Sequence, residues 1–401
     1  MKKKTLWIIN FFAGTFETGF GERHYYFSKY FKKNNIDVKI ISSTFNHYWK
    51  KFPPSGKKFN FEKYEDLEYC WVRTPKYKAE SIKRFWSMMV FSISVLFLPV
   101  KKLGKPDVIL VSSMPIFPVF FAYYWRKKFK NSKLIFEIRD LWPLSAVYLG
   151  NYSLNHPVIK FIGFFEKFGY KKSDVVVSLL KNSQRYMENI AGKKINFEYI
   201  PNGFYKNQNY QKLPQDIEDK IPKNEFIVGY AGSLGLMNFT ENLVEAAKYL
   251  LNYPEIKIVI LGEGILKSKL ETLAKGNNNV LFFDKIEKKY VREFINKFDV
   301  CYIGWKKIPL YDFGVSANKY FEYMSLGKPV LEINSPVGSP IRESECGIYL
   351  ESDSPLEIAE SIIKLYKMKN SEREETGLKG REFVEKFHDI EKLAEKYSKL
   401  F

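Results

Sequence analysis

The sequence predicts an α/β protein built from two Rossmann-like domains in tandem. Short β-rich runs alternate with longer helical runs along the whole chain, which is typical of parallel sheets covered by helices. The length of 401 residues suits two domains of about 200 residues each. A polar stretch at 206–223 separates two such alternating series and is interpreted as an interdomain linker.

The first domain is expected over 1–205. The apolar run after the N-terminal lysines superficially resembles a signal peptide, but Asn10 interrupts it and a Gly-rich turn follows. A first buried strand is therefore the better interpretation. Most of the expected strands end at Gly, Ser, Asn or Asp, as they do where parallel strands deliver loops to a binding crevice. They lie at 6–10, 38–42, 108–111, 134–138, 175–178 and 197–200.

The second domain is expected over 206–388, with helices such as 240–251 and 290–297 between its strands. A last helical stretch from 389 has no strand after it, so it must pack on existing surface. The second series of strands lies at 226–230, 257–261, 280–283, 300–303, 329–333 and 348–350.

The net charge of +19 is concentrated in the first half of the chain. Residues 1–205 hold 35 Lys and Arg against 15 Asp and Glu, whereas the remainder is nearly neutral. This asymmetry favours a polyanionic partner, either an anionic membrane surface or nucleic acid, over a merely lysine-rich solvated surface. No nucleic-acid-binding module is recognised, so nucleic acid is not expected as the partner.

The apolar run 86–100 is too short to span a bilayer. It is either a buried core helix or a helix that lies in the membrane interface. Three isolated cysteines and four scattered histidines show no ligand spacing. Neither a disulfide framework nor a metal site is therefore expected, and a reducing cytosol fits this composition.

Two loops of the first domain are candidate sites. The Gly-rich turn before the first helix contains Gly19, Gly21, Glu22 and Arg23, and a helix N-terminus there favours an anion. Arg23 opposes the helix dipole, which suggests a phosphate contact. Arg139 and Asp140 directly follow a strand, where α/β active sites form. A local ion pair between these two residues is the alternative.

Two segments of the second domain are also candidates. The helix after 317 presents Asn318, Lys319 and Glu322, with the last two on one face. These two form either a surface salt bridge or a site at the interdomain cleft. There the carboxylate binds ribose hydroxyls and the lysine neutralises a diphosphate. The other segment is a Gly-rich turn whose backbone amides could cradle a diphosphate, before a helix expected to be capped by Asn238. The turn consists of Gly232, Ser233, Leu234 and Gly235.

Together these segments resemble family 4 glycosyltransferases of the GT-B type. The resemblance rests on IRDLWP, YIPNGF, VGYAGSLG, LGEG at 261–264, FDVCYIG and NKYFEYMSLGKPV. It implies two Rossmann-like domains facing each other across a cleft, with a C-terminal helix at about 389–401 crossing back onto the first. IRDLWP and NKYFEYMSLGKPV are similar to the branch that includes N-acetylfucosamine transferases of bacterial surface polysaccharide synthesis.

The resemblance also assigns roles. Glu322 matches the second glutamate of the family's E-x7-E motif, the ribose ligand, whereas the first glutamate would fall at Gly314 and is absent. The family's basic pair would fall at Ser233 and Asn238, and neither is basic. Lys319 is therefore expected to neutralise the diphosphate. The implied donor site consists of Gly232, Ser233, Leu234, Gly235, Gly262, Glu263, Asn318, Lys319 and Glu322, and the implied catalytic residues are Lys319, Arg139 and Asp140.

The implied function is that of a retaining glycosyltransferase with a nucleotide-sugar donor, expected to be UDP-linked, and with no cofactor or metal. The sugar is expected to be an N-acetylated amino or deoxyamino hexose. The acceptor would be an undecaprenyl-diphosphate-linked glycan of O-antigen or capsule synthesis, at the cytoplasmic face of the plasma membrane, with the protein bound peripherally. Alternatives are an inverting enzyme with Asp140 as base, a sugar-nucleotide 2-epimerase of the same fold, and a basic nucleic-acid-binding protein.

Overall fold

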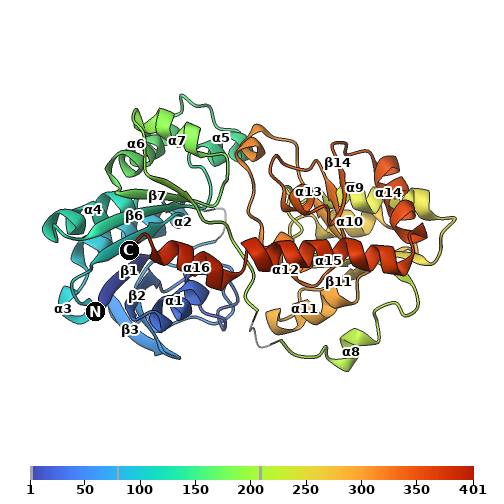
Figure 1. The fold of residues 1–401 in the computed structure, drawn as a ribbon, viewed down its shortest axis with the longest axis horizontal. Coiled ribbons are helices and arrows are strands. Elements are labelled where there is room, and N and C mark those ends of the chain that lie inside the picture. Colours follow the sequence, from blue (N-terminus) through green and yellow to red (C-terminus); the bar gives the residue numbers. More distant parts are fainter. Residues whose placement is uncertain (1–2, 79–80, 207–209) are drawn as a thin grey trace. The chain divides into compact units, whose positions relative to one another are not determined.

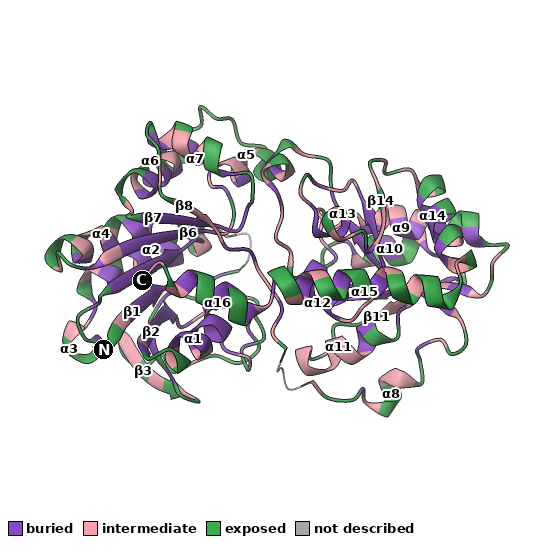
Figure 2. Ribbon diagram, in the orientation of Figure 1, coloured by how far each residue is buried: buried purple, intermediate pink, exposed green. Residues whose placement is uncertain are grey.

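The computed structural model describes residues 3–78, 81–206 and 210–401. Its contacts divide the chain into two units. The first unit consists of Met1–Pro201 together with Ile390–Phe401, and the second of Asn202–Asp389. Each unit is built around one sheet whose central strands are buried, with exposed residues on the outer faces of its helices (Figure 2).

The first unit contains an eight-stranded sheet in the order β3-β4-β2-β1-β5-β6-β7-β8. All neighbouring strands are parallel except β3 and β4, which form an antiparallel hairpin at one edge. The strand order reverses beside β1, which is where doubly wound sheets bind ligands. The strands are β1 Lys4–Ile9, β2 Ile36–Ser43, β3 Phe59–Tyr64, β4 Leu67–Val72, β5 Val108–Ser112, β6 Lys133–Ile138, β7 Val175–Ser178 and β8 Phe197–Tyr199.

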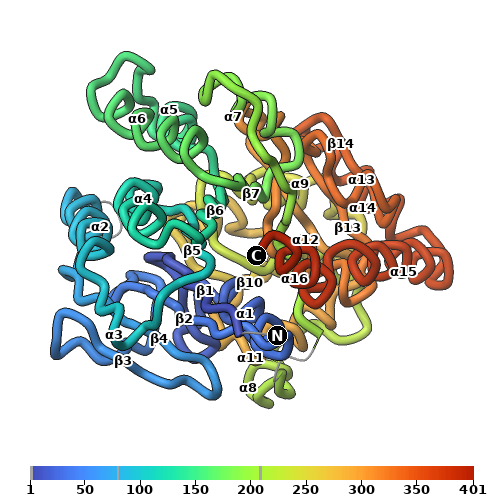
Figure 3. Tube along the Cα trace, turned by 60° about the vertical axis from the view of Figure 1, so that its left-hand side comes forward, coloured from blue at the N-terminus to red at the C-terminus, as the bar shows by residue number. Residues whose placement is uncertain are grey.

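Helices cover both faces of this sheet (Figure 1). The C-terminal helix α16 lies beside α1, where the Tyr397 ring packs edge-on against Phe27 and Phe31. On the other flank α2, α4 and α6 lie side by side (Figure 3). The helices are α1 Arg23–Lys33, α2 Ile82–Ser94, η1 Val95–Phe97, α3 Val100–Leu103, α4 Pro118–Lys128, α5 Leu144–Gly150, α6 Pro157–Lys172, α7 Gln184–Ala191 and α16 Ile390–Ser398.

The second unit contains a six-stranded, wholly parallel sheet in the order β11-β10-β9-β12-β13-β14. Numbered along the chain, this is the Rossmann order 3-2-1-4-5-6, with the reversal between β9 and β12. The strands are β9 Phe226–Ala231, β10 Ile256–Leu261, β11 Val280–Phe283, β12 Val300–Gly304, β13 Val330–Ile333 and β14 Gly347–Leu350. The helices are α8 Gln215–Glu218, α9 Thr240–Ala246, η2 Ala247–Leu250, α10 Lys267–Leu273, α11 Lys288–Asn296, η3 Pro309–Phe313, α12 Asn318–Ser325, α13 Pro340–Ser344, α14 Pro355–Lys367 and α15 Asn370–Phe387.

All twelve strands expected from the sequence are present, and the α/β fold with two parallel-sheet units is confirmed. The hairpin β3–β4 was missed, because β3 is a half-exposed edge strand in which Asn60, Glu62 and Lys63 weaken the apolar signal. Its tight turn uses Glu65 at φ +52°.

Two local expectations were wrong. The polar segment 206–223 is not a free linker over its described part, because Leu213 and Ile221 are buried in the core of the second unit. The apolar run 86–100 is not one helix: α2 ends at Ser94, and a 3-10 turn leads to Pro99. Across the residues that the structure describes, no helix is both long and apolar enough to cross a membrane.

Candidate functional site

The loops that follow β9 and β10 contact each other closely through their backbones, at Gly232 and Gly262. Leu234 N–H donates to Glu263 O at 2.9 Å, and Gly232 N–H donates to Leu261 O at 2.9 Å. A Cβ atom at Gly262 would lie 1.9 Å from Gly232 O, so only glycine allows this approach. The Gly232–Gly235 turn is therefore a firmly supported backbone feature at the carboxyl end of the sheet.

Lys319 is delivered to this turn from the first turn of α12. Its Nζ donates to Asn238 Oδ1 at 2.6 Å and to Tyr230 OH at 3.0 Å, and it lies 4.4 Å from the Tyr230 ring centroid. Tyr230 OH and Asn238 Nδ2 in turn donate to Ser233 O, at 2.6 and 2.8 Å. The lysine, the tyrosine and the asparagine thus form one hydrogen-bonded group on the predicted diphosphate turn.

The ammonium group of Lys319 is electrostatically uncompensated by its hydrogen-bond partners, both of which are neutral oxygen atoms. Burial lowers the pKa of Lys319 to about 7, although the nearby charge of Glu322 raises it in part. The N-terminus of α12 adds a partial positive charge at the same place. A site with this excess of positive charge is suited to an anion.

Asn238 does not cap the following helix, as the sequence suggested. Helix α9 begins at Thr240, and its N-cap is Phe239 in the left-handed region. The Asn238 side chain instead bridges Ser233 O and Lys319 Nζ. Local spacing cannot distinguish these roles, because Lys319 is about 80 residues away in sequence and only the fold brings it to Asn238.

The other predicted donor residues lie on the same unit but not all on the same turn. Asn318 is exposed at the start of α12. Glu322 lines a small pocket with Lys288 and Arg292 of α11, whereas Lys319 points to β9. Glu263 forms an ion pair with Lys267 at 2.8 Å. The structure therefore brings Lys319 to the glycine turn and places Glu322 beside the basic face of α11.

The Gly-rich turn of the first unit is closely packed on itself. Gly21 has φ +87°, and a Cβ atom there would lie 1.9 Å from Phe12 O. Glycine at 21 is therefore required by the backbone of the turn. Gly19 also has a positive φ, of +77°, but its Cβ position faces open space.

Arg23 is buried, with 8% of its surface exposed. Its guanidinium pairs with Glu137 at 3.0 Å and donates to Pro201 O at 2.7 Å and Ile200 O at 2.9 Å. The geometry does not support the phosphate contact expected for Arg23. The cation at this helix start is instead explained by its buried carboxylate partner, Glu137 on β6.

Glu137 is the centre of this buried network. Its carboxylate also accepts hydrogen bonds from Ser112 Oγ at 2.7 Å and from Tyr397 OH of α16 at 3.1 Å, and His24 Nε2 lies 3.1 Å away. Burial alone would raise the pKa of Glu137, but Arg23 and His24 hold it well below its usual range. The network ties α1, β6 and the C-terminal helix together. Sequence reasoning missed it, because Glu137 reads as one charge at the end of an apolar strand.

Arg139 and Asp140 follow β6, as predicted. Arg139 N–H donates to Ser113 Oγ at 2.9 Å, which anchors the loop. Asp140 is exposed. No ion pair joins the two side chains in the described structure, so the alternative of a local ion pair is not supported.

Within the described ranges, no group of three or more His, Cys, Asp or Glu side chains could hold a metal ion. The absence of a cofactor remains a prediction.

Comparison with known proteins finds a family model that matches part of the chain. Residues 213–383 match the model of "Glycosyl transferases group 1". An uncharacterised glycosyltransferase of Methanocaldococcus jannaschii is 24% identical over 269 residues, covering 63% of this chain and 62% of that protein. A second from the same organism is 26% identical, covering 58% and 59%. The match thus spans about three fifths of the curated relatives.

Solved structures match over nearly the whole chain. Sucrose-phosphate synthase from Thermosynechococcus elongatus has a TM-score of 0.71 at 15% identity, covering 99% of this chain and 98% of that one. WaaG, a glycosyltransferase involved in lipopolysaccharide biosynthesis, has a TM-score of 0.66 at 15% identity, covering 99% of both chains. The Anabaena protein HepE in complex with UDP and glucose has a TM-score of 0.68 at 12% identity, also covering 99% of both. At these identities the likeness establishes the fold alone. The chain therefore has the GT-B fold, and its residues 213–383 are similar to the group 1 glycosyltransferases.

Proposed function

We propose that the chain is a retaining glycosyltransferase that uses a nucleotide-diphosphate sugar, UDP-linked, without a metal or cofactor. The observation that carries this proposal is the ammonium group of Lys319, held by two neutral oxygens on the Gly232–Gly235 turn. A departing diphosphate at this turn would meet a cation, backbone amides and a helix N-terminus. These groups stabilise charge that develops as the nucleotide leaves.

The position of Lys319 also accounts for the departure from the family motif. Asn238 stands where the resemblance places a basic residue, and Lys319 Nζ lies 2.6 Å from its side-chain oxygen. The ammonium group of Lys319 therefore lies within hydrogen-bond distance of position 238, where the basic residue of the family is absent. UDP as the nucleotide is supported by two structural neighbours, one described in complex with UDP and glucose and one bound with UDP-2-fluoro glucose.

For the chemical step we propose that the acceptor hydroxyl attacks the face that the nucleotide leaves, with the leaving phosphate oxygen as base. No side-chain base is then required, and rate enhancement comes from positioning and from charge on the diphosphate. Asp140 and Arg139 contact the sugar or the acceptor in this scheme. An inverting enzyme would instead need Asp140 as its base.

The proposed acceptor is a lipid-diphosphate-linked glycan of the kind used in O-antigen or capsule synthesis. The transferred sugar would be an N-acetylated amino or deoxyamino hexose, as in the N-acetylfucosamine transferase branch. The protein would act at the inner face of the plasma membrane as a peripheral protein. The basic first half of the chain supports this assignment, because each Lys or Arg near an anionic leaflet contributes about 1 kcal/mol.

The flank formed by α2, α4 and α6 supports membrane contact. Trp86 and Phe164 are 59% and 55% exposed, and Phe120 and Phe161 are also exposed. Phe117 connects them, since its ring lies 5.6 Å from Phe85 and 6.0 Å from Phe161. Helices α2 and α4 contain no acidic residue, and the one in α6 is buried. Exposed aromatic rings without carboxylates, flanked by lysines, suit an anionic bilayer interface.

The donor and the stereochemistry are tested by incubating the protein with a panel of sugar nucleotides, with UDP and GDP as thermal-shift controls. Product anomers are then assigned by NMR. Lys319→Ala should lower kcat by about 10²-fold or more, while donor affinity falls much less. Equal turnover in Lys319→Ala would refute the assignment of Lys319, and an inverted product would favour Asp140 as base.

Membrane contact is tested by sedimentation with vesicles containing phosphatidylglycerol at low salt. Trp86→Ser with Phe164→Ser should weaken sedimentation by about tenfold or more, since two exposed rings leave the interface. Tyr249→Ser with Leu251→Ser removes two exposed apolar side chains from the second unit and is the matched control. Equal loss in both double variants would contradict the proposal.

A further inference from the structure

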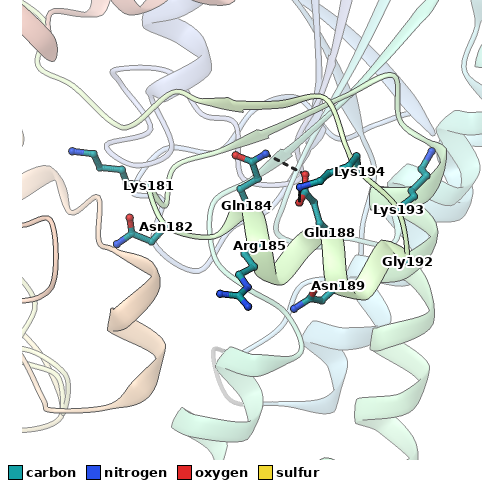
Figure 4. A pocket seen from close by; sticks show the side chains of 9 residues that line it. All are labelled: Lys181, Asn182, Gln184, Arg185, Glu188, Asn189, Gly192, Lys193 and Lys194. Atoms are coloured by element: carbon teal, nitrogen blue, oxygen red, sulfur yellow. Dashed lines mark hydrogen bonds and ion pairs between the residues drawn. The ribbon is translucent and has the colours of Figure 1, made fainter.

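Helix α7 and the loop before it form an open basic groove on the first unit (Figure 4). Arg185 and Asn189 are four residues apart on α7 and both are exposed, so one side of the helix is polar, while Met187 and Ala191 are buried on the other. The groove is lined by Lys181, Asn182, Gln184, Arg185, Glu188, Asn189, Gly192, Lys193 and Lys194.

The positive charge of this groove is only partly neutralised. Glu188 is its one acidic residue, and it pairs with Lys194 at 3.0 Å and accepts from Gln184 Nε2 at 3.2 Å. Arg185 and Lys193 are exposed, and no acidic side chain of the described residues forms an ion pair with either. Two cations are therefore available to an anionic ligand.

The support beneath α7 adds no negative charge at neutral pH. Tyr186 OH of α7 donates to the buried Glu166 of α6 at 2.9 Å, and Tyr170 OH donates to the same carboxyl oxygen at 3.2 Å. Burial raises the pKa of Glu166 to about 8, although the two tyrosine hydroxyls lower it in part. The carboxyl group is thus mostly protonated at pH 7. It fixes the helix to α6 without opposing an anion in the groove.

The groove also lies where α/β sheets bind ligands. Strand β7 ends at Ser178, and the turn that follows is held by Ser178 Oγ and Ser183 Oγ, 2.8 Å apart, and by Ser183 Oγ donating to Leu180 O at 2.8 Å. This turn delivers Lys181 to the carboxyl edge of the parallel sheet. The loop is therefore held in part by the hydrogen bonds of its own serines.

We propose that the α7 groove binds the diphosphate of the acceptor, with Arg185 and Lys193 as its principal contacts. This inference rests on the proposed function, because it takes the acceptor to be a lipid-diphosphate-linked glycan. A guanidinium binds phosphate oxygens in a bidentate manner, and a lysine adds a point charge beside it. The groove thus recognises the anionic end of the acceptor.

The test is direct binding of geranyl diphosphate, measured in the Lys319→Met background so that the donor-site cation does not contribute. Arg185→Glu with Lys193→Glu should weaken this binding by about tenfold or more. Lys248→Glu with Lys379→Glu makes the same change in net charge at exposed positions of the second unit and should have little effect. Unchanged binding in the groove variant, equal loss in both variants, or no binding to the parent protein would overturn the proposal.

Two further arms separate the acceptor diphosphate from lipid headgroups and from the glycan. Sedimentation with phosphatidylglycerol vesicles should fall no further in the groove variant than in Lys50→Glu with Lys57→Glu, which makes the same charge change at exposed positions of the first unit. A larger fall in the groove variant would mean that the groove binds lipid phosphates in general, and this result would contradict the proposal. In transfer assays the groove variant should raise KM for a diphosphate-linked glycan and leave KM for the same glycan on a neutral alkyl chain unchanged. Absence of any transfer would count against the proposed function but would leave the geranyl diphosphate result to decide this inference.

Discussion

Protonation of Lys319 offers a direct test of the donor site. The free protein holds this lysine with a pKa of about 7, because its ammonium group is buried beside neutral oxygens. A bound diphosphate would bring negative charge to the ammonium and raise its pKa. Binding of UDP should therefore take up a proton at any pH between the free and the bound pKa values.

The size of the effect follows from the free pKa. At pH 7 about half of the Lys319 side chains are charged, and at pH 8 roughly a tenth, so UDP binding should take up close to one proton at pH 8. Affinity for UDP should fall about fivefold from pH 7 to pH 8, because only the charged lysine binds well. The nucleotide contributes little to this change, since a phosphate with a second pKa near 6 is already ionised.

Proton uptake is measured by isothermal titration calorimetry in buffers of different ionisation enthalpy. Lys319→Met should abolish the uptake at pH 8, and Lys319→Arg should bind with little pH dependence because arginine stays charged. Lys328→Met is the matched control. Burial also lowers the pKa of Lys328, but its Nζ donates to Asn296 O, at 2.8 Å, away from the glycine turn.

Equal proton uptake at pH 8 in wild type and Lys319→Met would refute the reasoning, because the titrating group would then lie elsewhere. Loss of uptake in Lys328→Met would lead to the same conclusion.

Three further predictions concern the first unit. Glu166 has its pKa raised to about 8 by burial, so its contribution to stability is present below its unfolded pKa and is lost as pH rises towards 8. Unfolding free energy from urea titrations should thus fall by up to roughly 1.4 kcal/mol per pH unit in that window, and Glu166→Gln should flatten the slope. Arg23→Met should cost about 3–5 kcal/mol of unfolding free energy because it leaves Glu137 buried without its main partner. Lys51→Met, which breaks the exposed pair with Glu17, should have little effect on the unfolding free energy. Similar costs in the two variants would contradict a buried network. In thermal melts, Gly21→Ala should destabilise the protein by more than about 1 kcal/mol, because of the positive φ at residue 21 and the contact of the added Cβ with Phe12 O. Gly56→Ala should be nearly neutral in the same melts, because the added Cβ meets open space.

Much of the fold could be predicted from the sequence because buried parallel strands leave a local signal. Each of the twelve expected strands is a short apolar run next to a turn residue, and burial on both faces requires such a run. The hairpin β3–β4 escaped because its edge strand is half exposed, so neither the alternation nor the apolar content stood out. The helix cap expected at Asn238 was wrong for another reason, since Asn238 has the residue type of a cap but its side chain is hydrogen-bonded to Lys319.

The sequence alone determined the doubly wound architecture, the glycine turns after β1, β9 and β10, and the candidate positions around Lys319 and Asp140. Only the tertiary structure decided what those side chains contact. It joined Lys319 to Tyr230 and Asn238, and it gave Arg23 a buried partner in Glu137, 114 residues away. It also gathered the basic residues of α7 over a protonated Glu166. The physical reason is that burial and charge pairing depend on neighbours distant in sequence, whereas strand and turn patterns depend on adjacent residues.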